Sequence, residues 1–221
     1  MDFVFMLTRA DRTIPDGIEV LREIRSLELR HIGFKDVGIP PEALRELHAE
    51  IKAMGATSYM EVVSTSKEAC LASARVAAQL GVDRLLGGTD VEDVLQILAG
   101  TSTVYMPFPG KPFGHPTQLG GSAELVEADC KRYAEQGCAG VDILAYRATE
   151  ADPLELVRAS RRGTPGTVLV AGGVKTAAQI EAIADAGADA FTIGSAVFDG
   201  SFAPLVGSLR SQLRAVLDAC H

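Results

Sequence analysis

The chain has 221 residues, of which 47% are hydrophobic and 23% are charged, with a formal net charge of -8. This composition supports a buried core and excludes a disordered, collagen-like or coiled-coil protein. The 29 acidic residues outnumber the 21 basic ones, which form no run. Nucleic acid is therefore excluded as an expected partner, because its phosphates attract the opposite charge.

Targeting and redox signals are sparse along the chain. No apolar stretch approaches the length of a membrane span, and the apolar run after Asp2 is too short for a signal peptide, so no membrane partner is expected. The four cysteines are scattered without metal-ligand spacing, and they are Cys70, Cys130, Cys138 and Cys220. We interpret them as thiols of a reducing compartment and expect a cytoplasmic protein.

Short apolar runs alternate with amphipathic stretches along the whole chain. Their starts are spaced by an average of about 27 residues, enough for a strand and a crossover helix. The predicted strands are Phe3–Arg9, His31–Val37, Ser58–Ser64, Arg84–Gly88, Thr103–Pro107, Val141–Arg147, Thr167–Gly172 and Ala190–Gly194.

Helical periodicity fills the intervals between these runs. Helices are predicted over Pro41–Met54, Thr176–Ala186 and Leu205–Leu217, the first and last with an apolar face. Glycines follow the helical patterns and predict left-handed C-terminal caps, at Gly55, Gly81, Gly100, Gly137, Gly163 and Gly187.

Eight strand–helix units with strands apolar on both faces predict a parallel sheet. We expect a single-domain (β/α)₈ TIM barrel over residues 1–221, with no linker. An open doubly wound sheet would also alternate, but no glycine-rich fingerprint follows the first strand. In a barrel, function lies at the carboxyl ends of the strands and in the loops after them.

Lysine and acid side chains near the ends of strands two and three are the first candidates for chemistry. Lys35 and Glu61 cannot comfortably face the outer helices, so both are expected in the barrel mouth, within ion-pair range. Lys35 would be a proton donor, electrophile or Schiff-base amine, with Glu61 tuning it or acting as base. The alternative is a buried structural pair. Asp36 has the opposite parity and would start the loop or support Lys35.

Three other strand ends or loops offer charged candidates. Arg9 after strand one and Arg147 after strand six, next to Tyr146, are candidate substrate clamps, whereas Asp142 is expected to be structural. The long stretch from Pro107 to Gly121 contains Lys111, a candidate substrate-binding residue, and His115, a candidate acid or base. For Arg9 and His115 a solvated surface role is an equally simple interpretation.

The seventh and eighth units contain the sharpest motif. Two glycines, Gly172 and Gly173, follow strand seven, and Gly194 with Ser195 follows strand eight. Backbone N–H groups without a neighbouring Cβ can approach an anion closely, so this pair of loops predicts a phosphate site.

These closing units, Ala171-Gly172-Gly173 and Ile193–Phe198, resemble the ribulose-phosphate-binding barrel superfamily, which includes histidine-biosynthesis barrels and the orotidine-phosphate decarboxylase group. The resemblance implies a phosphate held by the backbones of Gly172, Gly173, Gly194 and Ser195. It covers about the last fifty residues. The aspartates of the histidine-biosynthesis isomerase are missing from strand one, Leu7-Thr8-Arg9, and from strand five, Tyr105-Met106-Pro107. Strand three lacks the Asp-x-Lys-x-x-Asp run of the decarboxylase group, so no member's mechanism transfers intact.

We therefore expect a cofactor-independent lyase or isomerase acting on a small phosphorylated sugar-like carbonyl compound. No metal site and no cofactor are expected, and a homo-oligomer is possible. The alternative is a non-catalytic phosphometabolite-binding or regulatory barrel. A flavin-dependent barrel would share the phosphate loops, but no other flavin signal is present.

Overall fold

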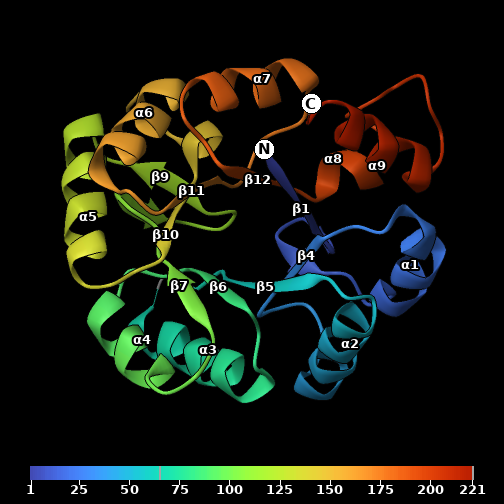
Figure 1. Cartoon of the computed structure of the whole chain (residues 1–221), viewed down its shortest axis with the longest axis horizontal. Helices are drawn as coiled ribbons and strands as arrows, with labels where there is room; N and C mark the ends of the chain where they lie inside the picture. Colours follow the sequence, from blue (N-terminus) through green and yellow to red (C-terminus); the bar gives the residue numbers. More distant parts are fainter. Residues whose placement is uncertain (65, 221) are drawn as a thin grey trace.

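Eight parallel strands form one sheet at the centre of the computed structural model, which describes residues 1–64 and 66–220 (Figure 1). His221, the last residue of the predicted domain, lies outside the described residues. In sheet order the strands are β10 (Gly140–Ile143), β11 (Thr167–Val170), β12 (Ala190–Ile193), β1 (Asp2–Met6), β4 (His31–Lys35), β5 (Thr57–Val62), β6 (Arg84–Gly87) and β7 (Val104–Met106).

Backbone hydrogen bonds between the two outermost strands close the sheet. The Ala139 N–H donates to the Tyr105 carbonyl at 3.0 Å, and the Asp142 N–H donates to the Pro107 carbonyl at 2.9 Å. The predicted TIM barrel is therefore confirmed, and the open doubly wound alternative is wrong.

Helices surround the barrel and cover its outer face (Figure 1). Phe34 of β4 faces outward, with its ring centroid 6.4 Å from that of His48, whereas its neighbour Lys35 faces inward. The helical segments are α1 (Gly17–Ile24), η1 (Arg25–Leu27), α2 (Pro41–Ala53), α3 (Lys67–Leu80), α4 (Val91–Leu98), α5 (Ala123–Glu135), η2 (Ala145–Arg147), α6 (Pro153–Gly163), α7 (Ala177–Asp185), α8 (Ser195–Phe198) and α9 (Leu209–Asp218). Within the described residues, no helix is long and apolar enough to cross a membrane.

Most of the glycines predicted to end helices do so. Gly55, Gly81, Gly100, Gly137 and Gly187 have φ between +71° and +100°. The prediction for Gly163 is wrong, because this residue is the last of α6 and has no positive φ. A Cβ there would lie 2.5 Å from Cβ of Cys130 and 2.6 Å from the Glu127 carbonyl oxygen, so Gly163 lets α6 pack closely on α5.

Several predicted boundaries are corrected at the segment ends. Strand one ends at Met6, and the chain then forms a separate antiparallel hairpin of β2 (Thr8–Arg9) and β3 (Arg12–Thr13). Strand six ends at Ile143, and residues 145–147 form the 3₁₀ turn η2. The last helix begins at Leu209, because Leu205 is fully exposed and has no core to cover.

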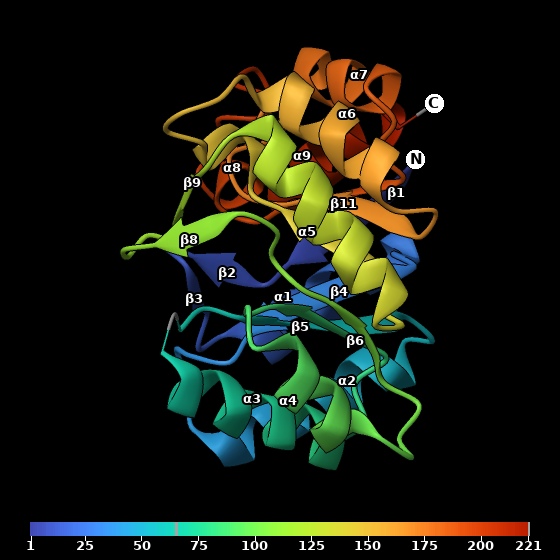
Figure 2. The ribbon, with the colours of Figure 1, turned by 90° about the vertical axis from the view of Figure 1, so that its left-hand side faces the viewer.

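Two hairpins lie at one end of the barrel, and the chain termini lie at the other (Figure 2). The first is β2–β3, and the second is β8 (Lys111–Phe113) with β9 (Gln118–Gly120), inside the predicted loop from Pro107 to Gly121. Both hairpins follow the carboxyl ends of barrel strands, so they stand beside the mouth where a barrel places its site.

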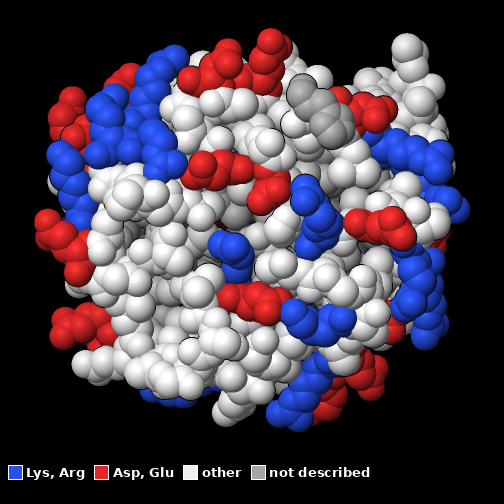
Figure 3. All heavy atoms as spheres, in the orientation of Figure 1, with Lys and Arg blue, Asp and Glu red and all other residues white. Residues whose placement is uncertain are grey.

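Charged side chains of both signs cover the end of the barrel where the termini lie (Figure 3). Basic side chains gather over α5 and α6, but they are ion-paired: Arg162 contacts Glu127 at 2.8 Å and Glu155 at 3.0 Å. This surface is therefore locally balanced in charge.

Candidate active site

A cavity of about 600 Å³ opens at the mouth of the barrel. Its wall contains Lys35 and Glu61 together with the two glycine loops of the seventh and eighth units. The residues of these loops in the wall are Gly172, Gly173, Val174, Lys175, Gly194 and Ser195. The barrel thus brings the predicted phosphate loops and two predicted catalytic residues to one space, and their roles remain predictions.

Strand register explains the contact between Lys35 and Glu61. The two residues are direct partners in the β4–β5 pairing, so their side chains leave the sheet side by side on the inner face. Lys35 Nζ lies 3.0 Å from Glu61 Oε1, and both residues are only 5% exposed. The ion pair expected from the sequence is present.

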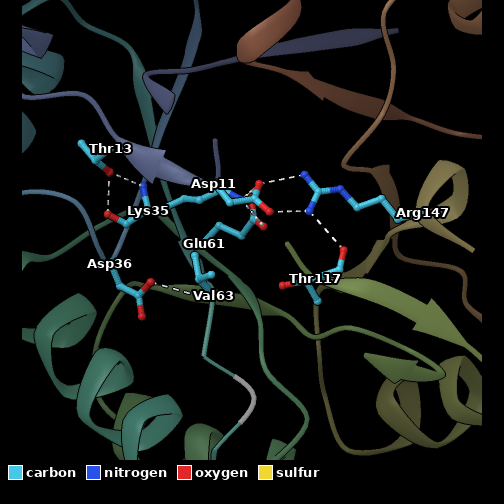
Figure 4. A network of polar contacts seen from close by, with 8 residues as sticks. All are labelled: Asp11, Thr13, Lys35, Asp36, Glu61, Val63, Thr117 and Arg147. Atoms are coloured by element: carbon cyan, nitrogen blue, oxygen red, sulfur yellow. Dashed lines mark hydrogen bonds and ion pairs between the residues drawn. The ribbon is translucent and has the colours of Figure 1, made fainter. Parts of the chain in front are cut away.

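Asp11, which was not predicted, joins Lys35 to Arg147 (Figure 4). Its Oδ1 accepts hydrogen bonds from Lys35 Nζ at 2.9 Å and from Arg147 Nη2 at 2.7 Å, and its Oδ2 accepts one from Arg147 Nη1 at 2.6 Å. Arg147 Nη1 also donates to the Thr117 carbonyl at 3.1 Å. Arg147 therefore lines the cavity as predicted, but with its guanidinium already bound to a carboxylate.

The β2–β3 hairpin positions Asp11 through its turn and through one threonine. Ala10 and Asp11 have φ of +47° and +59°, the conformation of a tight two-residue hairpin turn. The Thr13 hydroxyl donates to the Lys35 carbonyl at 2.7 Å and accepts from the Lys35 N–H at 2.8 Å. The hairpin is thereby fixed to β4, directly beside the lysine that Asp11 contacts.

Burial and mutual contact set the protonation of this cluster. Burial alone lowers the pKa of Lys35, but the charges of Glu61 and Asp11 and their hydrogen bonds raise it above its usual value. Burial alone raises the pKa of Asp11, but the hydrogen bond of Arg147 and the charge of Lys35 lower it well below its usual range. The Asp11 hydrogen bond also raises the pKa of Arg147, despite burial. Lys35 and Arg147 are thus cations, and Asp11 is an anion, at neutral pH.

Asp142, on β10, is fully buried, and neither carboxyl oxygen has a hydrogen-bond partner among the described residues. Burial, reinforced by the charge of Glu61, raises the pKa of Asp142 well above its usual value, against the opposing charges of Lys35 and Arg147. An ionised carboxylate would be very costly there, so the surroundings of Asp142 favour its neutral form. The sequence predicted a structural role for Asp142, but it did not predict that the charges of Glu61, Lys35 and Arg147 act on its pKa.

The glycine loops present bare backbone to the cavity. Gly172 and Gly173 have φ of +70° and +90°, and in the described part of the chain their N–H groups donate no hydrogen bond. A Cβ at Gly172 would collide with the Arg147 guanidinium, and one at Gly173 would lie 2.8 Å from Cβ of Tyr146. Glycine is therefore required at both positions for conformation and for space, and two backbone donors are left for a ligand.

Four predicted site residues do not line this cavity. Arg9 lies in a different surface depression, with its guanidinium 4.6 Å from the centroid of the Phe198 ring. Lys111 and His115 are exposed on the β8–β9 hairpin, which contributes Thr117 instead. These placements correct the expectation that the three residues lie at the mouth. The Arg9 guanidinium packs on the Phe198 ring, and Lys111 and His115 extend into solvent from the β8–β9 hairpin.

Asp36 points away from Lys35, toward Val63 and α3 (Figure 4). Its carboxylate accepts hydrogen bonds from the Val63 N–H at 3.1 Å and from the Ser73 hydroxyl at 2.5 Å. Burial raises the pKa of Asp36, although these two hydrogen bonds oppose the rise. Asp36 therefore links β4, β5 and α3, in agreement with the supporting role expected from its position next to Lys35. Its carboxylate does not line the cavity.

Comparisons with known proteins are consistent with this geometry. A family model described as histidine biosynthesis protein matches residues 116–204, which contain both glycine loops. The matched segment is 89 of the 221 residues, and it holds the two motifs that resemble the ribulose-phosphate-binding barrels. No curated protein matches the sequence. Among solved structures, orotidine 5'-phosphate decarboxylase from Pyrococcus horikoshii OT3 is similar, with a TM-score of 0.71 and 14% identity over 99% of this chain and 98% of that one.

Two further solved structures are similar in fold. The native KDPGal structure has a TM-score of 0.67 and 13% identity, covering 99% of this chain and 94% of that one. The Amycolatopsis orientalis BexX/CysO complex gives a TM-score of 0.63 and 17% identity, covering 100% of this chain and 90% of that one. Identities this low show the fold alone, so they select no member of the superfamily.

Proposed function

We propose that this protein is a ribulose-phosphate-binding barrel, and that it is a cofactor-independent lyase or isomerase acting on a small phosphorylated sugar-like carbonyl compound. The observation that carries the proposal is the shared cavity, in which Lys35 stands between two carboxylates. The cavity wall also contains two glycine loops, and the N–H groups of Gly172 and Gly173 have no acceptor among the described residues. The superfamily's name denotes phosphorylated ligands, and the orotidine 5'-phosphate decarboxylase that resembles this chain takes a phosphate ester by its name.

In this proposal the phosphate binds the backbone of Gly172, Gly173, Gly194 and Ser195, and the carbonyl end reaches Lys35. The ammonium of Lys35 stabilises the negative charge that develops on the carbonyl oxygen when a neighbouring bond is broken. Glu61 moves the proton between adjacent carbon or oxygen atoms.

Between the two roles open to Lys35, its surroundings favour the ammonium role over an imine. A Schiff base requires the neutral amine, and the raised pKa of Lys35 opposes that form. Asp11 and Glu61 both accept hydrogen bonds from Nζ and hold its charge in place. Borohydride in the presence of substrate would accordingly leave the protein unmodified.

The test is a thermal-shift screen of phosphorylated aldoses and ketoses, followed by a turnover assay of each compound that binds. We expect Lys35→Met to retain phosphate binding and to lower kcat by about 10²–10⁴-fold. The matched controls are His115→Ala and Lys111→Met, which change exposed groups outside the cavity and are expected to keep full turnover. Binding without turnover across all compounds would instead favour the regulatory barrel.

A further inference from the structure

We propose that Asp11 sets the charge of the substrate: because it occupies Arg147, the cavity takes compounds whose only anionic group is the phosphate. This inference rests on the proposed phosphate site and deepens it. It assigns Asp11 as a specificity-determining residue and assigns the substrate to monophosphorylated, otherwise uncharged carbonyl compounds.

The charges of the inner cluster balance before any ligand enters. Two cations, Lys35 and Arg147, contact two carboxylates, Asp11 and Glu61. Asp142 is fully buried, with no hydrogen-bond partner for either oxygen in residues 1–64 and 66–220, and it contributes no further charge in its neutral form. The reacting end of a ligand in this part of the cavity therefore meets a neutral cluster, which suits a carbonyl or hydroxyl group better than a second anion.

Arg147 has the geometry of an anion clamp that is already filled. A guanidinium binds a carboxylate best through two parallel hydrogen bonds, and Asp11 makes this pair at 2.6 and 2.7 Å. Thr117 takes one more donor through its carbonyl. A substrate carboxylate or second phosphate would have to displace Asp11 or lie beside it, and like charges in a partly buried site repel.

The hairpin leaves Asp11 little freedom to withdraw. Its turn contains two residues of positive φ, and the Thr13 hydroxyl bonds both backbone groups of Lys35. Asp11 is only 7% exposed, and its carboxylate is held on both sides by cations. The exclusion of a second anion is therefore built into the fold.

This assignment also limits the reaction class. A substrate without a carboxylate cannot lose carbon dioxide, so the chemistry would be isomerisation or cleavage of a carbon–carbon bond next to a carbonyl. A reaction that supplies this substrate would deliver a sugar-like monophosphate rather than a phosphorylated acid or a bisphosphate.

The experiment measures dissociation constants by calorimetry for four probes: inorganic phosphate, ribulose 5-phosphate, 6-phosphogluconate and fructose 1,6-bisphosphate. For the wild-type protein we expect ribulose 5-phosphate to bind at least tenfold more tightly than the two probes with a second anion. For Asp11→Asn, which frees Arg147 at nearly constant volume, we expect this ratio to fall at least tenfold.

Two variants isolate Arg147 as the cause. Asp199→Asn removes the same charge from the same cavity wall without touching Arg147, and it is expected to keep the wild-type ratio. In the double variant Asp11→Asn, Arg147→Met the gain for 6-phosphogluconate should disappear. If Asp11→Asn does not fold, the wild-type ratio still decides the inference, because equal binding of 6-phosphogluconate and ribulose 5-phosphate would overturn it.

The outcomes separate the two proposals. If inorganic phosphate and all three phosphate esters fail to bind the wild-type protein, the phosphate site is wrong and this inference falls with it. If the esters bind but 6-phosphogluconate competes equally in the wild-type protein, or Asp11→Asn leaves the ratio unchanged, the inference alone is overturned.

Discussion

The glycine loops and the charged cluster line the same cavity, but the loops offer backbone groups and the cluster consists of side chains. The loops after β11 and β12 present backbone, and each is encoded by a few consecutive residues. The cluster is made of side chains from the β2–β3 hairpin, β4, β5 and η2, and the Asp11–Arg147 contact joins residues 136 positions apart. A backbone site can be recognised from local sequence, whereas a side-chain cluster exists only once the barrel has closed.

This difference has an energetic counterpart. Backbone donors in the loops are fixed by glycine conformations and are free for a ligand. The cluster instead satisfies its charges internally, so removing one member leaves others buried without a partner. We therefore expect the cluster to affect stability and the loops to affect binding, and the following predictions test that division.

The largest expected effect concerns Lys35. Lys35→Met leaves the carboxylates of Asp11 and Glu61 buried without their shared cation, and we expect the free energy of unfolding to fall by about 3–5 kcal/mol. Urea denaturation at pH 7 measures this change. The matched control is Lys67→Met, which removes an exposed ion pair with Asp93 and should cost far less. Equal losses for the two variants would mean that the cluster is not a stabilising unit.

The next effect separates backbone strain from the loss of the phosphate site. Gly172→Ala and Gly81→Ala place a side chain at φ of +70° and +71°, which costs about 1–2 kcal/mol in each. Only at Gly172 does the new Cβ collide with Arg147, since nothing lies within 4 Å at Gly81. We expect phosphate-induced thermal stabilisation to be lost in Gly172→Ala and kept in Gly81→Ala. Loss in both, or in neither, would contradict the assignment of this loop.

A smaller, pH-dependent effect is expected at Asp142. The pKa of Asp142 is raised in the folded state. Above the pKa that this residue has in the unfolded chain, the folded protein therefore keeps a proton that the unfolded chain has released. The free energy of unfolding consequently declines as the pH rises. Asp142→Asn removes that penalty. We expect the variant to gain stability relative to the wild type between pH 4 and pH 8, by about 1 kcal/mol or more.

Parallel urea titrations of both proteins at several pH values measure this difference. Asp36→Asn is an instructive comparison, because the Asp36 pKa is also raised but its carboxylate has two hydrogen-bond donors to lose. If the difference in unfolding free energy between Asp142→Asn and the wild type did not change with pH, Asp142 would have to be ionised in the folded protein. The cluster would then carry one more negative charge.

Periodicity alone was enough to predict the barrel and most of its helices. Eight apolar runs bury both faces only in a parallel sheet with helices outside, and glycine caps at positions such as Gly81 follow from local conformation. Lys35 and Glu61 were also predictable, because a charge near the carboxyl end of a doubly buried strand must face the mouth. The errors arose beyond the strand ends, where residues 8–13 form a hairpin and residues 145–147 form a 3₁₀ turn. In such segments the hydrophobic pattern no longer indicates which way a side chain points.

Asp11 shows why the rest was not predictable. It lies between arginines in a short polar stretch, and the one local signal available was an acid in the loop after the first strand. Its partners come from β4 and η2, and only the closure of the sheet places them together. The same closure buries Asp142 without a partner.

By itself, the sequence determined the architecture and the positions of the two glycine loops, because hydrophobic period and glycine conformation act over short stretches of chain. The tertiary structure alone decided that Arg147 is bound by Asp11, that Arg9, Lys111 and His115 lie outside the cavity, and that Asp142 is isolated. The physical reason is that electrostatic interactions depend on distance in space, and in a barrel the strand ends that meet are distant in sequence.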